Sequence, residues 1–165
     1  MRRSQRLCTT FMLLAAISVP GAATHAGSED HYKRGPLVHT TDGPVRGFVA
    51  KGVNTFLGIP YAAPPVGDLR WMPPERPKPH GLLRATEFGN TCPQVTTLGA
   101  FAGPASTTED CLYLNVYTTG FKGAKPVIVW IHGGGNVTGE TNDYDGRKLA
   151  TGGPDAPWAS GHTCH

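Results

Sequence analysis

The feature that most constrains the fold is the apolar run Val127–Ile131, which His132-Gly133-Gly134-Gly135 follows directly. A continuous run of five apolar residues is typical of a strand that is covered on both faces of a sheet. The glycines that follow let the backbone pass close to a bound molecule and turn its N–H groups toward a negatively charged oxygen. The pattern therefore predicts a buried strand that ends at an oxyanion-stabilising loop.

Two simpler interpretations of this glycine loop stay open at this point. A glycine triplet taken alone is often only a flexible turn. In addition, the sequence nearly matches the pattern of a phosphate-binding loop, with four residues between Gly134 and Gly139 and then Glu140-Thr141. That motif needs a lysine where Glu140 stands, because the lysine neutralises the phosphates. A carboxylate at this position repels them, so nucleotide binding is not favoured.

An oxyanion-stabilising loop works with a nucleophile, and the sequence offers none in the usual setting. A serine within a Gly-x-Ser-x-Gly elbow commonly lies opposite such a loop. None of the five serines of the chain has glycine at both positions two residues away. His132 therefore has no nucleophile in the sequence to serve as a base. We interpret His132 and Gly133 as residues that support the loop, with His132 acting through hydrogen bonds.

Residues 1–26 have the layout of a secretory signal peptide, with three arginines, the apolar stretch Phe11–Val19 and small residues up to Ala26. Cleavage after Ala23 or after Ala26 fits this layout. The apolar stretch is too short to span a membrane, which takes roughly 20 residues, and no later segment qualifies. We expect a secreted protein, extracellular or periplasmic, with no membrane span; the alternative is a disordered basic N-terminus.

The charge of the chain does not support nucleic-acid binding. Without residues 1–26 the 15 Lys and Arg residues fall to 12, which equals the 12 Asp and Glu residues. A nucleic-acid-binding surface leaves a clustered basic footprint. We therefore expect no nucleic-acid partner.

Cysteine usage predicts one disulfide, between Cys92 and Cys111, around a loop rich in Gly, Thr and Ala. Closing a loop of this length stabilises a fold by about 3 kcal/mol on the chain-entropy model, and export makes oxidation expected. Cys8 leaves with the signal peptide, and Cys164 has no partner. His162, Cys164 and His165 lack a fourth ligand, so we predict no metal site.

Hydrophobic periodicity and turn residues predict short strands and one helix. A hairpin is expected from residues 37–40 and 45–50 around Asp42-Gly43. Residues 55–61 predict a strand that is an edge or ends at Pro60, because proline cannot donate to a ladder. Period-two alternation predicts a half-buried strand at 112–117, and 144–150 predicts a helix. Residues 62–79 are too rich in proline for regular structure, and Leu69 and Trp71 are their predicted anchors into a core.

Five motifs that follow one another between Leu37 and Ala150 closely resemble the type-B carboxylesterase and cholinesterase family. They are Gly43-Pro44-Val45-Arg46-Gly47; Phe56-Leu57-Gly58-Ile59-Pro60-Tyr61-Ala62 with Pro64-Pro65-Val66-Gly67 and Leu69-Arg70-Trp71; Cys92-Pro93-Gln94; Glu109-Asp110-Cys111-Leu112-Tyr113-Leu114-Asn115-Val116; and Val129-Trp130-Ile131-His132-Gly133-Gly134-Gly135.

The resemblance implies an α/β fold, the N-terminal part of an α/β-hydrolase in which antiparallel strands lead into the central mixed sheet. It implies a serine esterase that acts on a small-molecule ester without a cofactor. Gly134 and Gly135 correspond to the oxyanion N–H donors, and Cys92 with Cys111 to the first disulfide loop of the family. Glu109 and Asp110 match an acidic pair with a structural role, which anchors Arg70 or a neighbouring backbone.

The sequence departs from the family at two places. Asn136 stands where the family usually has an aromatic or small apolar residue lining the pocket, which changes the expected substrate preference. After Ala150 the family continues with a strand, the nucleophile, the acid and the histidine, and residues 151–165 match none of these. We expect a signal peptide (1–26), an incomplete esterase portion (27–150) and an unrelated or frame-shifted tail (151–165).

These departures lead us to expect a truncated, inactive and poorly soluble fragment of an esterase, because an apolar strand edge left unpaired promotes aggregation. Two alternatives remain. One is a non-catalytic binding or adhesion module, since cholinesterase-like domains also serve in that way. The other is a fragment with no function.

Overall fold

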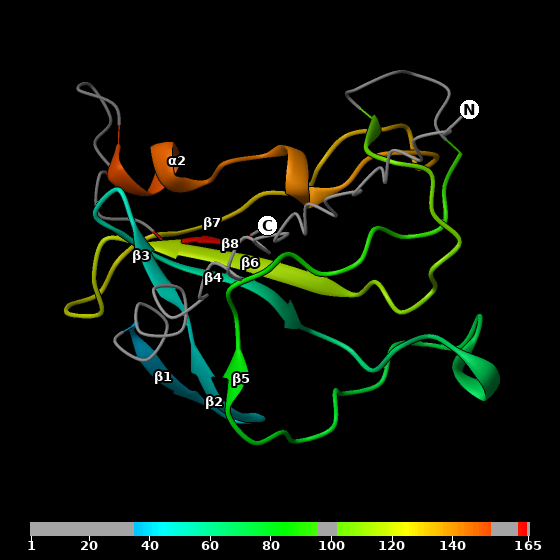
Figure 1. The fold of residues 1–165 in the computed structure, drawn as a ribbon, viewed down its shortest axis with the longest axis horizontal. Helices are drawn as coiled ribbons and strands as arrows, with labels where there is room; N and C mark the ends of the chain where they lie inside the picture. Colours follow the sequence, from blue (N-terminus) through cyan, green and yellow to red (C-terminus); the bar gives the residue numbers. More distant parts are fainter. Residues whose placement is uncertain (1–34, 96–101, 153–161, 165) are drawn as a thin grey trace, which may run out of the picture.

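Two β-sheets pack against each other in the computed structural model, which describes residues 35–95, 102–152 and 162–164 (Figure 1). The three-stranded sheet has the order β1-β2-β5, and the five-stranded sheet has the order β3-β4-β6-β8-β7. The predicted signal peptide lies outside the described residues. The strands are β1 (Leu37–Thr40), β2 (Gly43–Arg46), β3 (Phe48–Ala50), β4 (Val53–Pro60), β5 (Leu83–Arg84), β6 (Tyr113–Thr118), β7 (Val127–Val129) and β8 (His162–Cys164).

The predicted hairpin is present, but its second strand divides at Gly47. β1 and β2 pair antiparallel, and the chain then enters the other sheet as β3, which pairs with β4. The N–H of Gly47 donates to the carbonyl oxygen of Pro36 at 2.9 Å. A Cβ atom at position 47 would lie only 2.2 Å from the carbonyl oxygen of Thr55. Glycine is therefore what lets the chain cross between the sheets here.

β4 lies in the interior of the five-stranded sheet, between β3 and β6, and ends at Pro60 as predicted. Because successive side chains of a strand point to opposite faces, β4 contributes to two apolar clusters. One lies under helix α2 (Arg147–Thr151) and contains Val53, Leu57, Tyr117 and Ala150; the other lies between the two sheets and contains Val45, Phe56 and Ala85. A single strand thus joins both halves of the core.

A bulge in β4 connects the sheet to the segment that follows the glycine loop. The pairing of β4 with β6 shifts register between Phe56 and Ile59. Gly58 adopts a φ of +65° there, and its N–H donates to Oδ1 of the buried Asn115 at 2.9 Å. Nδ2 of Asn115 donates in turn to Oγ1 of Thr141 at 3.3 Å. Asn115 therefore ties β4, β6 and the 3₁₀ turn η3 (Thr141–Asp143) together.

β7 forms where a strand was predicted, but the expectation that it is covered on both faces is wrong for the described part of the chain. β7 is the edge of the five-stranded sheet and pairs in parallel with β8, which also pairs antiparallel with β6. Val129 is 68% exposed and Ile131 is 83% exposed. The apolar side chains of this run are therefore exposed, because none of the described elements covers them.

The proline-rich residues 62–79 carry a single 3₁₀ turn, η1 (Gly67–Leu69), and the predicted anchoring by Trp71 is wrong. Trp71 is 89% exposed, and the guanidinium carbon of Arg70 lies 5.6 Å from the centroid of its ring. Nε of Arg70 pairs with Oε1 of Glu109. Trp71 therefore stacks on a surface ion pair, which removes it from the core.

α2 begins at Arg147, three residues later than predicted, and η3 precedes it at residues 141–143. Oδ1 of Asp145 accepts a hydrogen bond from the backbone N–H of Arg147 at 3.0 Å, which satisfies one donor of the helix N-terminus. The helix packs against β4, β6 and β8 (Figure 1). None of the helices in the described residues has the length and apolar character needed to cross a bilayer.

Phe56→Ala should lower the free energy of unfolding by about 3–5 kcal/mol, because it opens a cavity between the two sheets. Trp71→Ala, a matched aromatic truncation at an exposed site, should change it by less than about 0.5 kcal/mol. Urea denaturation followed by tyrosine and tryptophan fluorescence checks both values. A larger loss for Trp71→Ala than for Phe56→Ala would contradict the arrangement of the core.

Candidate functional site

The glycine loop after β7 has a backbone that side chains would disrupt. Gly134, Gly135 and Asn136 follow one another with φ values of +131°, +62° and +59°. A Cβ atom at position 134 would lie 1.6 Å from the carbonyl oxygen of Thr138. Only glycine can adopt this close approach, so glycine at position 134 is a structural requirement of a folded loop rather than a sign of flexibility.

The loop closes on itself through the carbonyl oxygen of Gly134. The backbone N–H groups of Val137 and Thr138 both donate to this oxygen at 3.1 Å. Among the described residues, none accepts a hydrogen bond from the backbone N–H of Gly134 or of Gly135. Two adjacent donors are therefore left without a protein partner in the part of the chain that the structure describes.

His132 lies beside the start of the loop. Its Nδ1 atom is 2.8 Å from the carbonyl oxygen of Gly133, and since a carbonyl only accepts, Nδ1 is the donor. The ring also lies close to Gly139, where a Cβ atom would be 2.6 Å from Nδ1. This geometry agrees with the predicted supporting role of His132, which stays a prediction.

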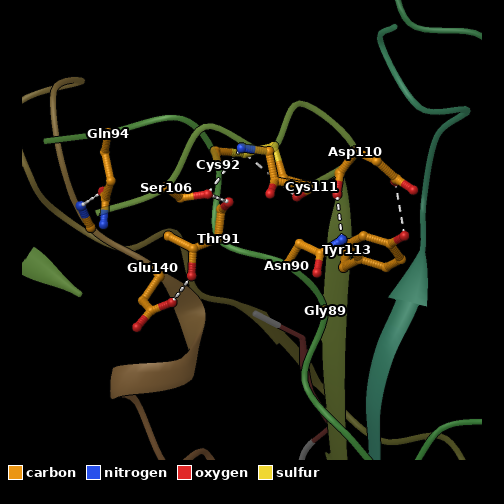
Figure 2. The surroundings of a disulfide bond; sticks show 12 residues. Gly89, Asn90, Thr91, Cys92, Gln94, Ser106, Asp110, Cys111, Tyr113 and Glu140 are labelled. Atoms are coloured by element: carbon orange, nitrogen blue, oxygen red, sulfur yellow. Dashed lines mark hydrogen bonds between the residues drawn. A yellow bond between two sulfur atoms is a disulfide. The ribbon is translucent and has the colours of Figure 1, made fainter. Parts of the chain in front are cut away.

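The disulfide between Cys92 and Cys111 is confirmed, with 5.0 Å between the two Cα atoms (Figure 2). The acidic pair before Cys111 has the structural contacts that the resemblance implied. Glu109 pairs with Arg70, and Oδ1 of Asp110 accepts a hydrogen bond from the Tyr113 hydroxyl at 2.8 Å. Burial, together with the neighbouring Asp110, raises the pKa of Tyr113 to about 12, so the phenol stays protonated and continues to donate.

Residues on either side of Cys92, in the disulfide segment (residues 91–94), hold the end of the glycine loop (residues 133–140). Oε1 of Gln94 accepts a hydrogen bond from the backbone N–H of Gly139 at 2.7 Å. The Thr91 hydroxyl donates to Oε2 of Glu140 (Figure 2). Nδ2 of Asn142 donates to the same oxygen at 3.0 Å. The disulfide segment and the loop therefore form one connected network of hydrogen bonds.

A cavity of about 570 Å³ lies between the disulfide segment, the start of β6 and the residues that follow β7. Trp130, His132, Asn136 and Glu140 line it, whereas Gly133, Gly134 and Gly135 do not. The predicted oxyanion glycines thus lie beside the cavity. Within the described residues, no group of three or more His, Cys, Asp or Glu side chains is placed to hold a metal ion.

Sequence reasoning missed Gln94, Thr91, Glu140 and Asn115. Their contacts join residues 26 to 57 positions apart in the chain, and no local period signals such a contact. The sequence did contain one hint, since Cys-Pro-Gln was among the motifs that carried the family resemblance.

Replacing both Cys92 and Cys111 by serine should lower the free energy of unfolding by about 3 kcal/mol, because the open loop regains chain entropy in the unfolded state. Glu109→Gln, which breaks the partly exposed pair with Arg70 next to the disulfide, should cost no more than about 1 kcal/mol. Urea denaturation of both variants tests this. Equal small losses would show that the disulfide does not stabilise the fold.

Known esterases resemble this chain in sequence. The model of the carboxylesterase family matches residues 34–154. The medium-chain fatty acyl-CoA hydrolase precursor of Anas platyrhynchos is 44% identical over 135 residues, which cover 70% of this chain and 24% of that protein. The fumonisin B1 esterase of Sphingopyxis macrogoltabida is 42% identical over 154 residues, which cover 90% of this chain and 27% of that protein.

Solved esterase structures share the fold. A structure of PNB esterase is 38% identical with a TM-score of 0.68, over 78% of this chain and 26% of that one. A carboxylesterase of Geobacillus stearothermophilus is 36% identical with a TM-score of 0.63, over the same shares. The chain spans about a quarter of the length of these relatives. It has the N-terminal part of an α/β-hydrolase fold, and it belongs to the carboxylesterase family.

Proposed function

We propose that this chain supplies the oxyanion-stabilising part of a carboxylic-ester hydrolase, through the backbone N–H groups of Gly134 and Gly135. The observation that carries the proposal is the pair of adjacent N–H groups, neither of which donates to another described residue. They stand on a loop whose backbone is fixed by close contact between Gly134 and Thr138. Donors that are held in place before the reaction stabilise a developing negative charge without reorganising.

The proposed reaction is acyl transfer from a small-molecule ester to a serine and then to water. As the serine oxygen attacks, the carbonyl π electrons move to the carbonyl oxygen, and a base accepts the serine proton. The two glycine N–H groups would donate to that oxygen, and the alcohol then leaves with a proton. Each such donor contributes about 10²–10³-fold to the rate in serine hydrolases.

The proposal assigns only part of the catalytic machinery to residues 1–165. Esterase relatives are about four times as long as the matched share of this chain, and none of the five serines here lies in a Gly-x-Ser-x-Gly elbow. We therefore propose that these 165 residues, taken alone, do not turn over esters. Residues 27–150 form the esterase portion in this proposal, and 151–165 are a tail of different origin.

We further propose export, directed by residues 1–26. The disulfide between Cys92 and Cys111 supports this, because such bonds persist in oxidising compartments and are rare in the cytosol. In this proposal, the protein is an extracellular or periplasmic enzyme.

A chimera of PNB esterase in which residues 34–154 of this chain replace the matched segment should hydrolyse p-nitrophenyl acetate and react with a fluorophosphonate probe. Residues 1–165 alone should do neither. In the chimera, Gly134→Ala should lower kcat about 10²–10³-fold, because it displaces the donors. Gly120→Ala, where the added Cβ atom meets no atom within 4 Å, is the matched control and should leave kcat unchanged.

An unchanged kcat in the Gly134→Ala chimera would contradict the oxyanion role. Labelling of the 165-residue chain by the fluorophosphonate would show that it contains a nucleophile of its own and would overturn the proposed division of the machinery.

A further inference from the structure

We propose that Gln94 is a positioning residue, which fixes the glycine loop by joining it to the disulfide segment. This inference rests on the proposed function, because the loop is what would bind the oxyanion. Gln94 precedes the loop by more than 35 positions in the chain, and the fold brings its side chain beside the loop. The side-chain amide of Gln94 acts on the loop through Gly139.

Gln94 is held firmly on its own side. Its backbone forms an isolated antiparallel bridge with Ser106, with N–H to carbonyl distances of 2.9 Å and 3.0 Å. Its half-buried side chain donates from Nε2 to the carbonyl oxygens of Ala102, at 2.5 Å, and Pro104, at 2.9 Å. Two positions before it, Cys92 forms the disulfide with Cys111. The remaining oxygen of the amide is therefore presented in a fixed direction.

That oxygen determines the place of Gly139. The Gly139 N–H donates to Oε1 of Gln94 at 2.7 Å and is shared with the carbonyl oxygen of Ala102 at 3.2 Å. On its other side, Gly139 touches the start of the loop, since a Cβ atom there would be 2.4 Å from the carbonyl oxygen of Gly133. A displacement of Gly139 therefore reaches Gly133 directly.

The residue after Gly139, Glu140, is also held by the disulfide segment. Glu140 is held by the hydroxyl of Thr91, which precedes Cys92, just as Gln94 follows it (Figure 2). Two consecutive loop residues, 139 and 140, are thus fixed by residues on both sides of one disulfide cysteine. Glu140 fixes the end of the loop, whereas Gln94 fixes Gly139, which contacts the backbone of Gly133.

Gln94 makes two kinds of hydrogen bond at once, accepting at Oε1 and donating from Nε2. One side chain must accept from Gly139 and donate two hydrogen bonds, to Ala102 and Pro104, and among neutral side chains only Asn and Gln carry two N–H donors together with an acceptor oxygen. Methionine has a similar length but makes neither kind of strong hydrogen bond. Glutamate keeps the acceptor for Gly139 and loses the donors, so the two substitutions separate the contact with Gly139 from the contacts with the carbonyls.

Hydrogen–deuterium exchange on the oxidised 165-residue chain at submicromolar concentration tests the inference, with residue-resolved fragmentation. Gln94→Met should accelerate exchange about tenfold at Gly139, which is the effect of losing one net hydrogen bond. It should also do so at Val137 and Thr138, whose backbone N–H groups donate to Gly134 and not to Gln94, because their bonds to Gly134 depend on the closed loop. Gln94→Glu should restore most of this protection, and Thr107→Ala, at an exposed residue of the same disulfide loop, should have no effect.

The amides of β4 serve as the internal reference for folding. The inference is overturned if Gln94→Met accelerates β4 as much as the loop, if only Gly139 responds, if nothing responds, or if Gln94→Glu is no better than Gln94→Met. Exchange requires no ester turnover, so these outcomes do not depend on those of the chimera. A loop that responds as expected while Gly134→Ala leaves kcat unchanged would refute the hydrolase proposal alone.

Discussion

The antiparallel pairing of β4 with β6 holds together both apolar clusters of the core. It joins segments more than 50 residues apart in the chain, from Asn54 opposite Thr118 to Pro60 opposite Tyr113. Such a long-range pairing costs chain entropy, and the two apolar clusters on either side of β4 offset that cost. The pairing also buries Asn115, whose amide accepts from Gly58 and donates to Thr141.

Asn115 links this sheet to the candidate site. A buried amide that lost its partners would leave unsatisfied polar atoms, which cost about 1–3 kcal/mol each, so the bulge at Gly58 and the position of Thr141 are mutually dependent. The glycine loop is consequently held from two directions. Thr141, in the segment that follows the loop, is bonded to Asn115 of the sheet. Gln94 and Thr91, in the disulfide segment, hold Gly139 and Glu140.

Local chemistry made part of this predictable. Proline ended β4, period two identified β6, and the cysteine pair was identified from its loop and its expected export. Residues whose role depends on distant neighbours were different. Gly47 resembled an ordinary strand residue because the reason for glycine is Thr55 of another strand. Trp71 was expected in the core because hydrophobicity alone does not reveal its stacking on Arg70.

The glycine loop was predictable from the sequence in part only. Its position after an apolar strand was visible in the sequence, as was the family resemblance, whereas the burial of that strand was overestimated and its anchoring by Gln94 was missed. β8 was missed as well, because three residues without a period carry no local strand signal. In each case the deciding contact is tertiary, and the sequence supplies only one of its partners.

In the proposed oxyanion role, Gly134 and Gly135 point their N–H groups at the oxyanion of an acylated or phosphonylated serine. A crystal structure of the PNB esterase chimera after reaction with a fluorophosphonate would show the position of both groups. We expect both glycine nitrogens to lie about 2.7–3.1 Å from the phosphonyl oxygen, the range for oxyanion donors. Glycine nitrogens that turn away from this oxygen, with other groups bound to it, would rule out the oxyanion role.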